Sequence, residues 1–177
     1  MNYSYTGNKI ITTNGDLYCW GDNEYGQVGN GTTTKQRTPI KVLDNVTAVS
    51  LSSNGSIAIT ANKDLYYWGG DGKKTIPTKA FSNVTDIASG AFHNAAIMEN
   101  GDLQCWGHND TGQVGSGVEW ATSAKVLGNV AAVSLGNWHS AAITTNGDLY
   151  CWGNNGSGQI GNGTIDNIQL TPVKINF

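Results

Sequence analysis

The segment Gly15–Gly21, which reads Gly-Asp-Leu-Tyr-Cys-Trp-Gly, decides the fold because it returns three more times along the chain. The later copies are Lys63–Gly69 (KDLYYWG), Gly101–Gly107 (GDLQCWG) and Gly147–Gly153 (GDLYCWG). Their tryptophans are separated by 48, 38 and 46 residues. Self-similarity at a period of about 20 to 50 residues is the signature of a repeat architecture. The 177 residues therefore predict four tandem repeats.

An Asn-Val pair lies a constant 23 residues before the tryptophan of each later copy. The three pairs are Asn45-Val46, Asn83-Val84 and Asn129-Val130. Variation in length is therefore confined to the stretch that follows each Trp-Gly. Because loops accept insertions that strands do not, this pattern indicates a rigid scaffold with variable connections.

The residues inside the constant stretch have the periodicity of β-strands. The second repeat predicts strands over 46–51, 57–60 and 64–68, and Pro39 suits an outer edge strand over 38–43, echoed at 171–175. Asn-Gly pairs at 14–15, 100–101 and 146–147 predict tight hairpins in which both residues take the positive φ of a type I′ turn. Four strands per unit of about 44 residues are typical of a propeller blade. The predicted fold class is all-β, a β-propeller of four-stranded antiparallel blades with four repeats per chain.

The predicted domain organisation is a single propeller domain over 1–177, with repeats at about 1–44, 45–82, 83–128 and 129–177. The end and the start of the chain are nearly contiguous in repeat phase, so in a closed ring we expect the two ends to complete one blade. Four repeats leave three arrangements: a compact four-bladed ring, an open arc, or an eight-bladed ring of two chains. An open arc would expose apolar blade faces, which favours a homodimer or a fragment cut from a longer array.

Composition argues against several classes of partner. The net charge is −3 and Arg37 is the single arginine, whereas a nucleic-acid-binding protein displays a basic face. We therefore expect no nucleic acid as a partner. No run of about 18 apolar residues is present, so we expect no membrane-spanning segment. The first residues lack the basic and apolar regions of a signal peptide, and the compartment stays open.

Further segments resemble the regulator of chromosome condensation repeat family. Two strand-entry segments, 87–97 (IASGAFHNAAI) and 133–143 (VSLGNWHSAAI), are similar to the signature of that family. After Trp-Gly, the segments 23–29, 109–115 and 155–161 share a Gly-Gln-(Val/Ile)-Gly core that matches the same family. The second repeat departs from the pattern because it runs Gly69–Lys74 where the others have this core.

The resemblance implies a propeller, usually of seven blades. It implies a protein partner, since members of the family include exchange factors, inhibitors of secreted enzymes and scaffolding domains. The namesake of the family is a nucleotide exchange factor for a small nuclear GTPase and also binds chromatin.

Repeated polar residues predict structure rather than chemistry. The Gly26–Gly31 loop lacks the Lys-Ser/Thr and the strand-to-helix setting of a phosphate loop, so we expect turn glycines, with the glutamines fixing the loops. Cys19, Cys105 and Cys151 share one repeat position without a Cys-x-x-Cys pair, which predicts buried thiols and no metal site. The residues that we assign to the scaffold are Trp20, Trp68, Trp106, Trp152, His93, His139, Gln27, Gln113 and Gln159.

No acid, base or nucleophile constellation repeats along the chain, so we predict no catalytic residue, no metal and no cofactor. Asp16, Asp64, Asp102 and Asp148 each follow a hairpin turn, which predicts turn stabilisation. Trp120 has no apolar counterpart in the other repeats and is the leading candidate for a partner contact, because aromatic residues anchor interfaces. The remaining candidate contacts are Glu24, Tyr25, Lys73, Lys74 and Asp110.

The sequence thus favours a non-enzymatic propeller scaffold that presents variable loops to another protein. These loops are 22–25, 69–74, 108–111, 118–121 and 154–157. Two alternatives stay open, a purely structural array of a bacterial surface protein and, by family analogy, guanine-nucleotide exchange or enzyme inhibition.

Overall fold

The computed structural model describes residues 7–118, 123–165 and 168–176, which form β-strands and turns and no helix. The chain folds as two compact units, Met1–Ile87 and Ala88–Phe177. The all-β prediction is confirmed. Among the described residues no apolar helix of membrane-spanning length occurs.

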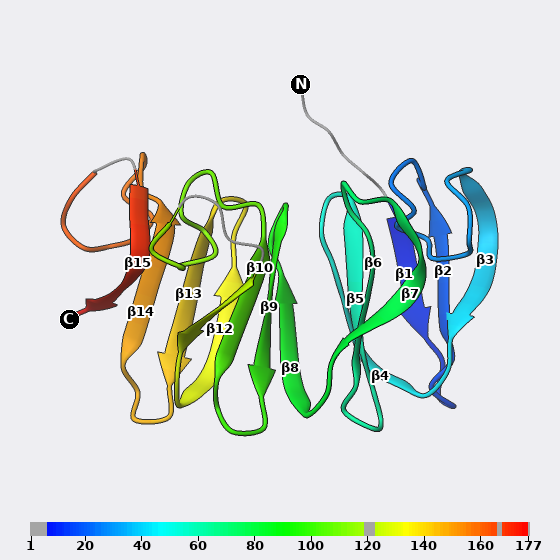
Figure 1. Cartoon of the computed structure of the whole chain (residues 1–177), viewed down its shortest axis with the longest axis horizontal. Coiled ribbons are helices and arrows are strands. Elements are labelled where there is room, and N and C mark those ends of the chain that lie inside the picture. The colour runs from blue at the N-terminus through cyan, green and yellow to red at the C-terminus, as the bar shows by residue number, and fades with distance from the viewer. Residues whose placement is uncertain (1–6, 119–122, 166–167, 177) are drawn as a thin grey trace. The chain divides into compact units, whose positions relative to one another are not determined.

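The first unit contains two antiparallel sheets, each built from consecutive strands (Figure 1). The N-terminal sheet has three described strands, β1 (Gly7–Ile11), β2 (Leu17–Gly21) and β3 (Gln36–Leu43). The next sheet has four, β4 (Val46–Leu51), β5 (Gly55–Thr60), β6 (Leu65–Gly69) and β7 (Lys74–Phe81). The strands predicted in the second repeat are therefore confirmed, with small extensions at their ends.

The second unit repeats the same up-and-down order in two four-stranded sheets. The strands of the first sheet are β8 (Val84–Ser89), which begins before the boundary between the units, β9 (His93–Met98), β10 (Leu103–Gly107) and β11 (Ser123–Leu127). The strands of the second are β12 (Val130–Leu135), β13 (His139–Thr144), β14 (Leu149–Asn154) and β15 (Ile168–Ile175). β15 is the fourth strand of its own sheet, and the sharing of one blade by the two chain ends in a closed ring stays a prediction, as does the single domain.

The hairpin turns that contain the Asn-Gly pairs, such as the turn between β1 and β2, differ from the predicted type I′. Gly15 has a φ of 84°, whereas Asn14 is not among the residues with positive φ. The Gly15 N–H donates to the Thr12 carbonyl at 2.9 Å, and the Thr12 N–H donates to the Asp16 carbonyl at 3.0 Å. This is a three-residue loop, in which a type I turn is followed by one left-handed residue in a bulge. The two-residue prediction is wrong because the extra loop residue lets glycine alone take the positive φ.

The Asn-Val pairs connect one repeat to the next. Asn45 has a φ of 56°, a left-handed conformation that asparagine tolerates better than most residues. The Val46 N–H donates to the Gly15 carbonyl at 2.8 Å, and the Asn45 carbonyl accepts the Ala61 N–H at 2.7 Å. In the second unit the Val130 N–H donates to Gly101 at 2.9 Å in the same way. Within each unit the pair, Asn45-Val46 or Asn129-Val130, therefore ties together the hairpin turns of two successive repeats.

The core lies between successive sheets within each unit. In the first unit Leu17, Cys19 and Val28 pack against Val46, Ala58 and Trp68. In the second, the cluster is formed by Ala95, Ile97, Leu103, Cys105, Val114, Val130, Ala142 and Trp152. Burial of this apolar surface is the main force that holds one repeat to the next.

A hydrogen bond from tryptophan fixes the same interface. The Trp68 indole N–H donates to the Gln27 carbonyl at 3.0 Å, and the Trp152 N–H donates to the Gln113 carbonyl at 2.9 Å. The approach is so close that a Cβ on Gly115 would lie 2.7 Å from the Trp152 Nε1 atom. We call this combination of loop carbonyl, glycine and following tryptophan the repeat joint.

Lys63 occupies the hairpin position that glycine occupies in the other repeats, with a φ of 60°. A left-handed conformation costs a residue with a Cβ about 1 kcal/mol. We expect Lys63→Gly to raise the free energy of unfolding by about 0.5–1 kcal/mol, measured by urea denaturation. Ala61→Gly in the same turn is the control, because position 61 is not among those with positive φ and should gain nothing. An unchanged or lower stability of Lys63→Gly would contradict the strain.

The joint also predicts a contrast between two equivalent glycines of the second unit. Gly115 and Gly161 have φ values of 80° and 76°, but a Cβ on Gly161 would meet nothing within 4 Å. Both Gly→Ala changes carry the cost of the positive φ. We expect Gly115→Ala to lose about 2 kcal/mol more, because its methyl group overlaps Trp152. Equal losses in urea denaturation of dilute samples would show that the close approach is unimportant.

Candidate interaction surface

A buried asparagine organises each loop that follows Trp-Gly in the first, third and fourth repeats. The Asn23 side-chain oxygen accepts the Val28 N–H at 2.9 Å, and its amide nitrogen donates to the Thr32 and Thr34 carbonyls, each at 3.0 Å. Asn109 and Asn155 accept the Val114 and Ile160 N–H groups at 2.8 and 3.1 Å. The sequence prediction missed these asparagines, although each lies three residues after its tryptophan.

The loop glutamines bind backbone of their own loops. The side-chain oxygens of Gln27, Gln113 and Gln159 accept the N–H groups two residues earlier at 2.9, 3.0 and 2.8 Å. Because asparagine and glutamine together satisfy the backbone within each loop, residues at the loop tips are left to face solvent.

In the first unit, the predicted contact residues lie on two loops. Glu24 is exposed, and Tyr25 is half-buried beside it, where its N–H is bound by Gln27. Lys73 is exposed and takes a left-handed φ of 46°. The Lys74 ammonium lies 4.9 Å from the centre of the Tyr67 ring, within the range of a cation–π interaction.

In the second unit, the exposed Asp110 lies beside an aromatic cluster that the sequence prediction did not identify as a surface. The Asp110 carboxylate is 3.5 Å from the His108 ring nitrogen. The His108 ring lies 5.6 Å from that of Phe92, and Phe92 lies 5.2 Å from Trp138, measured between ring centres. Trp138 is 38% exposed. Trp138 shares its repeat position with Phe92, and only the tertiary structure shows its exposure. We call Phe92, His108 and Trp138 the aromatic patch.

Trp120, the leading predicted contact, lies outside the described residues, as does most of the predicted loop 118–121. Val118, the one described residue of that loop, is 56% exposed. The fourth-repeat loop, 154–157, includes the exposed Gly156 and Ser157.

The predicted scaffold histidine His93 belongs to a buried polar chain at the repeat joint. Its Nε2 atom lies 2.9 Å from the Ser140 hydroxyl, which donates to the Gln113 carbonyl at 2.7 Å. Both side chains are fully buried. Burial, with a smaller effect of His139, lowers the pKa of His93 to about 4.

The first unit has the same series of buried hydrogen bonds, with a lysine in place of the histidine. Gly7 stands at the histidine position, and the Lys9 ammonium binds the Ser56 hydroxyl, which donates to the Gln27 carbonyl at 2.9 Å. The ammonium also lies 5.7 Å from the centre of the Trp68 ring. Burial lowers the pKa of Lys9 to about 8.

The three cysteines are buried and free. Burial raises the pKa of the Cys19 thiol to about 11 and that of Cys105 to about 12, and it also raises that of Cys151. The reactive thiolate is therefore suppressed at neutral pH. Within the described ranges no three His, Cys, Asp or Glu side chains gather as a metal site would require.

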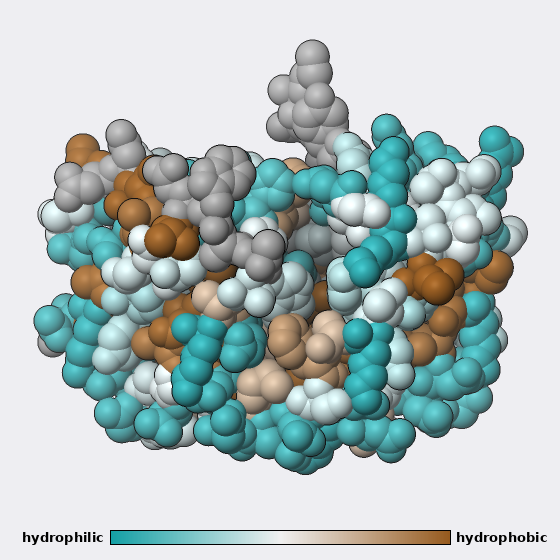
Figure 2. Space-filling model, viewed as in Figure 1, coloured by the Kyte–Doolittle hydropathy of each residue, from teal (hydrophilic) through white to brown (hydrophobic). Residues whose placement is uncertain are grey.

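The aspartates that follow the hairpin turns each pair with a lysine of the outer strand. The pairs, each with an N···O distance of 2.8 Å, are Asp16–Lys41, Asp64–Lys79, Asp102–Lys125 and Asp148–Lys174. The lysine partner holds the pKa of Asp16, Asp64 and Asp102 below the ordinary value. Hydrophilic residues follow the lower edge of Figure 2, where Figure 1 shows the turns. This polar end lies opposite the loops along the strands.

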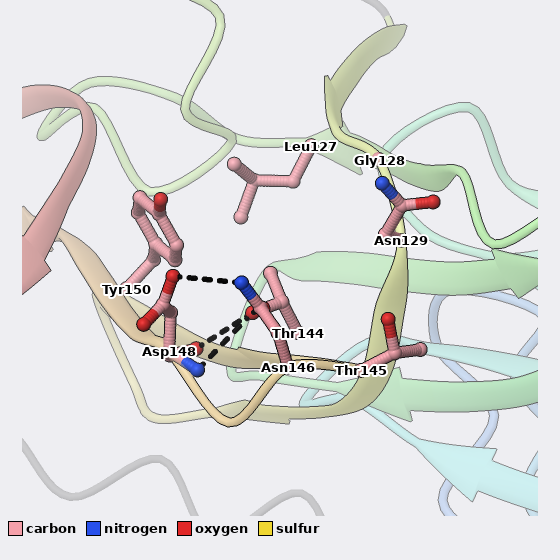
Figure 3. Close-up of a pocket in the computed structure, with 8 residues that line it drawn as sticks. All are labelled: Leu127, Gly128, Asn129, Thr144, Thr145, Asn146, Asp148 and Tyr150. Carbon is pink, nitrogen blue, oxygen red and sulfur yellow. Dashed lines mark hydrogen bonds between the residues drawn. The ribbon is translucent and has the colours of Figure 1, made fainter.

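A pocket of about 340 Å³ opens at the turn end of the second unit. Its lining residues are Leu127, Gly128, Asn129, Thr144, Thr145, Asn146, Asp148 and Tyr150 (Figure 3). Asn146 donates to the Asp148 carboxylate at 3.1 Å, and Asp148 is already paired with Lys174. The single carboxylate of the lining is thus engaged in holding the turn.

Comparison with characterised proteins finds short stretches of similarity. A segment of 76 residues, 39% of this chain, is 37% identical to 5% of Ras guanine nucleotide exchange factor C of Dictyostelium discoideum. A segment of 54 residues, 28% of the chain, is 44% identical to 1% of the human E3 ubiquitin-protein ligase HERC2. A third, 33% of the chain, is 35% identical to 14% of the Ultraviolet-B receptor UVR8 of Arabidopsis thaliana.

Similar solved structures extend over nearly the whole chain. Human WBSCR16 matches 97% of it with a TM-score of 0.82 and 24% identity, and Prp20p of Saccharomyces cerevisiae matches 97% with a TM-score of 0.81 and 22% identity. The chain spans about half the length of these proteins, 51% and 48%. At this identity the likeness establishes the fold.

Family models identify the repeats themselves. Two models described as the regulator of chromosome condensation (RCC1) repeat match the chain, one at 84–113 and 130–159 and the other at 14–59 and 146–177. The matched segments cover more than half of the chain and contain the joint residues Gln27, Gln113 and Trp152. The chain therefore belongs to the regulator of chromosome condensation (RCC1) repeat family.

Proposed function

We propose that this chain is a non-enzymatic scaffold that binds another protein through the loops that follow its tryptophans. The observation that carries the proposal is the self-sufficiency of these loops. Asn23 and Gln27 bind backbone within one loop, and Asn109 and Gln113 do so in another. A surface that is already ordered loses less conformational entropy when a partner binds.

The exposed residues around these loops have the chemistry of a protein interface. The aromatic patch offers Trp138 as an anchor, and Asp110 adds a charge at its rim. The first unit offers a basic pair, Lys73 and Lys74. Aromatic anchors with a charged rim are typical of sites that bind proteins.

What similar proteins bind is consistent with a protein partner. The solved structure of Prp20p is described with binding properties to Gsp1p and histones, and another structure contains Kap60 bound to yeast RCC1 (Prp20). The name of Ras guanine nucleotide exchange factor C adds nucleotide exchange as an activity of a similar protein. For this chain we propose only that its partner is a macromolecule, as in these similar proteins.

The buried polar groups argue for the non-enzymatic part of the proposal. The Ser140–His93 pair has the spacing of a nucleophile and its base, yet both residues are 0% exposed. The hydroxyl already donates to the Gln113 carbonyl, so its proton is engaged in the repeat joint. A nucleophile must reach its substrate, and this one is enclosed by two sheets.

We also propose that a second copy of the chain is among its partners, and that two copies complete a ring of eight repeats. The support is the apolar surface left on the fourth repeat. On that sheet Ile143 of β13 is 45% exposed and Ile168 of β15 is 40% exposed.

A binding experiment tests the loop function. The immobilised chain is exposed to a lysate of the cells that make it, and retained proteins are quantified by mass spectrometry. We expect Trp138→Ala and the double change Lys73→Ala/Lys74→Ala each to weaken retention of the same partner at least about tenfold, the size of an interface anchor. Lys125→Ala is the control. The Lys125 side chain is 58% exposed and lies on the polar end, so this variant should retain the partner as the wild type does. Equal retention by all variants would reject loop binding and favour the purely structural array.

The scaffold role of His93 predicts a pH dependence. The unfolded state takes up a proton near pH 6.5, whereas folded His93 resists protonation down to about pH 4. Stability therefore falls as the pH is lowered from about 6.5 to about 4, by up to about 3 kcal/mol. Urea denaturation across this range should show the fall in the wild type and in His108→Gln, and a flatter profile in His93→Gln. An NMR titration that placed the His93 pKa near 6.5 would contradict the burial.

A further inference from the structure

We propose that the C-terminal repeat of one copy receives the N-terminal repeat of a second copy through the repeat joint already formed inside each unit. The inference deepens the proposed pairing of two copies, on which it depends, by assigning the faces that meet. The forward face of a sheet is the one that packs on the following repeat, and the rear face is the one that packs on the preceding repeat.

The repeat joint occurs once in each unit and has an accepting half and a donating half. The accepting half is a glutamine carbonyl on the forward side, provided by Gln27 and by Gln113. The donating half is a tryptophan and a serine on the rear side. Trp68 and Ser56 donate to Gln27 at 3.0 and 2.9 Å, and Trp152 and Ser140 donate to Gln113 at 2.9 and 2.7 Å.

The N-terminal sheet carries the tryptophan of a donating half, with Asn8 at the serine position. Trp20 pairs with Asn8 across β1 and β2, as Trp68 pairs with Ser56 across β5 and β6, so it occupies the same register on the rear face. Among the described residues no acceptor binds its indole N–H. Ile10, which is two residues beyond Asn8, is 53% exposed, whereas Ala58 at the same position is fully buried.

The C-terminal repeat carries an accepting half with no donor. Gln159 is exposed, whereas Gln27 and Gln113 are 5% and 0% exposed beneath the following repeat. A Cβ on Gly161 would meet nothing within 4 Å, whereas a Cβ on Gly29 would lie 2.7 Å from the Trp68 Nε1 atom. The space that tryptophan fills in the inner joints is open here.

The apolar surfaces on the two faces correspond in the same way. Ile143 on the forward face is 45% exposed, whereas Ile97 at the equivalent position is 4% exposed against the following repeat. Docking would remove both Ile143 and Ile10 from water, which is favourable. A second copy is the occupant that carries both halves, and two copies meeting in this head-to-tail manner can close by meeting twice.

Mass measurement on paired variants tests the assignment. Light scattering with size-exclusion chromatography at about 100 µM is expected to give the wild type twice the 18.7 kDa mass of one chain. Ile10→Glu removes the rear face and Ile143→Glu removes the forward face, so each variant alone should stay monomeric. A 1:1 mixture should regain a dimer, because one copy keeps a native forward face and the other a native rear face. Ile76→Glu is the matched control, since Ile76 is 59% exposed and lies on neither terminal sheet.

The indole N–H has its own test. Trp20→Phe keeps an aromatic ring but leaves the Gln159 carbonyl without its donor. Because two copies that meet twice lose two such bonds, the dissociation constant should rise about a hundredfold, about tenfold for each hydrogen bond. Sedimentation velocity over a concentration series measures it.

Two failures are distinguishable. A wild-type chain that stays monomeric overturns the pairing of copies itself. If the wild type is dimeric, two results overturn the assignment of these faces. In one, the Ile10→Glu and Ile143→Glu variants remain dimeric alone. In the other, each variant is monomeric alone and their mixture also stays monomeric.

Discussion

One backbone carbonyl in each loop is the acceptor on which the stacking of repeats depends. The Gln27 and Gln113 carbonyls each accept an indole N–H and a serine hydroxyl from the following repeat. Both lone pairs of the oxygen are thereby used in an environment from which water is excluded, where an unpaired polar group would be costly. The apolar clusters supply most of the attraction between sheets, but they are not directional. The carbonyl fixes the registry in which one repeat meets the next.

The same carbonyl explains residues that look unrelated in the sequence. His93 reaches Ser140 in the second unit, and Lys9 reaches Ser56 in the first, where Gly7 replaces histidine. A histidine in one unit and a lysine in the other, at different positions of their strands, thus bind the serine at the same repeat position. Gly29 and Gly115 are required where a Cβ would overlap the tryptophan ring. These residues belong to one interface, in which they pack around the same carbonyl.

Separation of framework from loop supports the proposed binding of a partner. Buried asparagines close the loops on themselves, so their tips can vary without disturbing the joint. The aspartate–lysine pairs hold the opposite end of the strands. Exposed ion pairs contribute little stability, and their role is consistent with fixing the turns and keeping that end hydrophilic. The aromatic patch lies at the loop end, away from these ion pairs.

The sequence by itself determined the repeat, the strands and the family, because the periodic Trp-Gly segment and the Asn-Val pair are local patterns read directly from residue spacing. It also placed the loop glutamines. It misjudged the hairpin type, because Asn-Gly fits a two-residue and a three-residue loop and the choice depends on how β1 pairs with β2. Only the tertiary structure decided that Asn23 is buried, that Trp138 is exposed beside Phe92, and that Lys9 replaces a histidine. Each of these depends on which side chains from distant segments meet, and a spacing along the chain does not specify that.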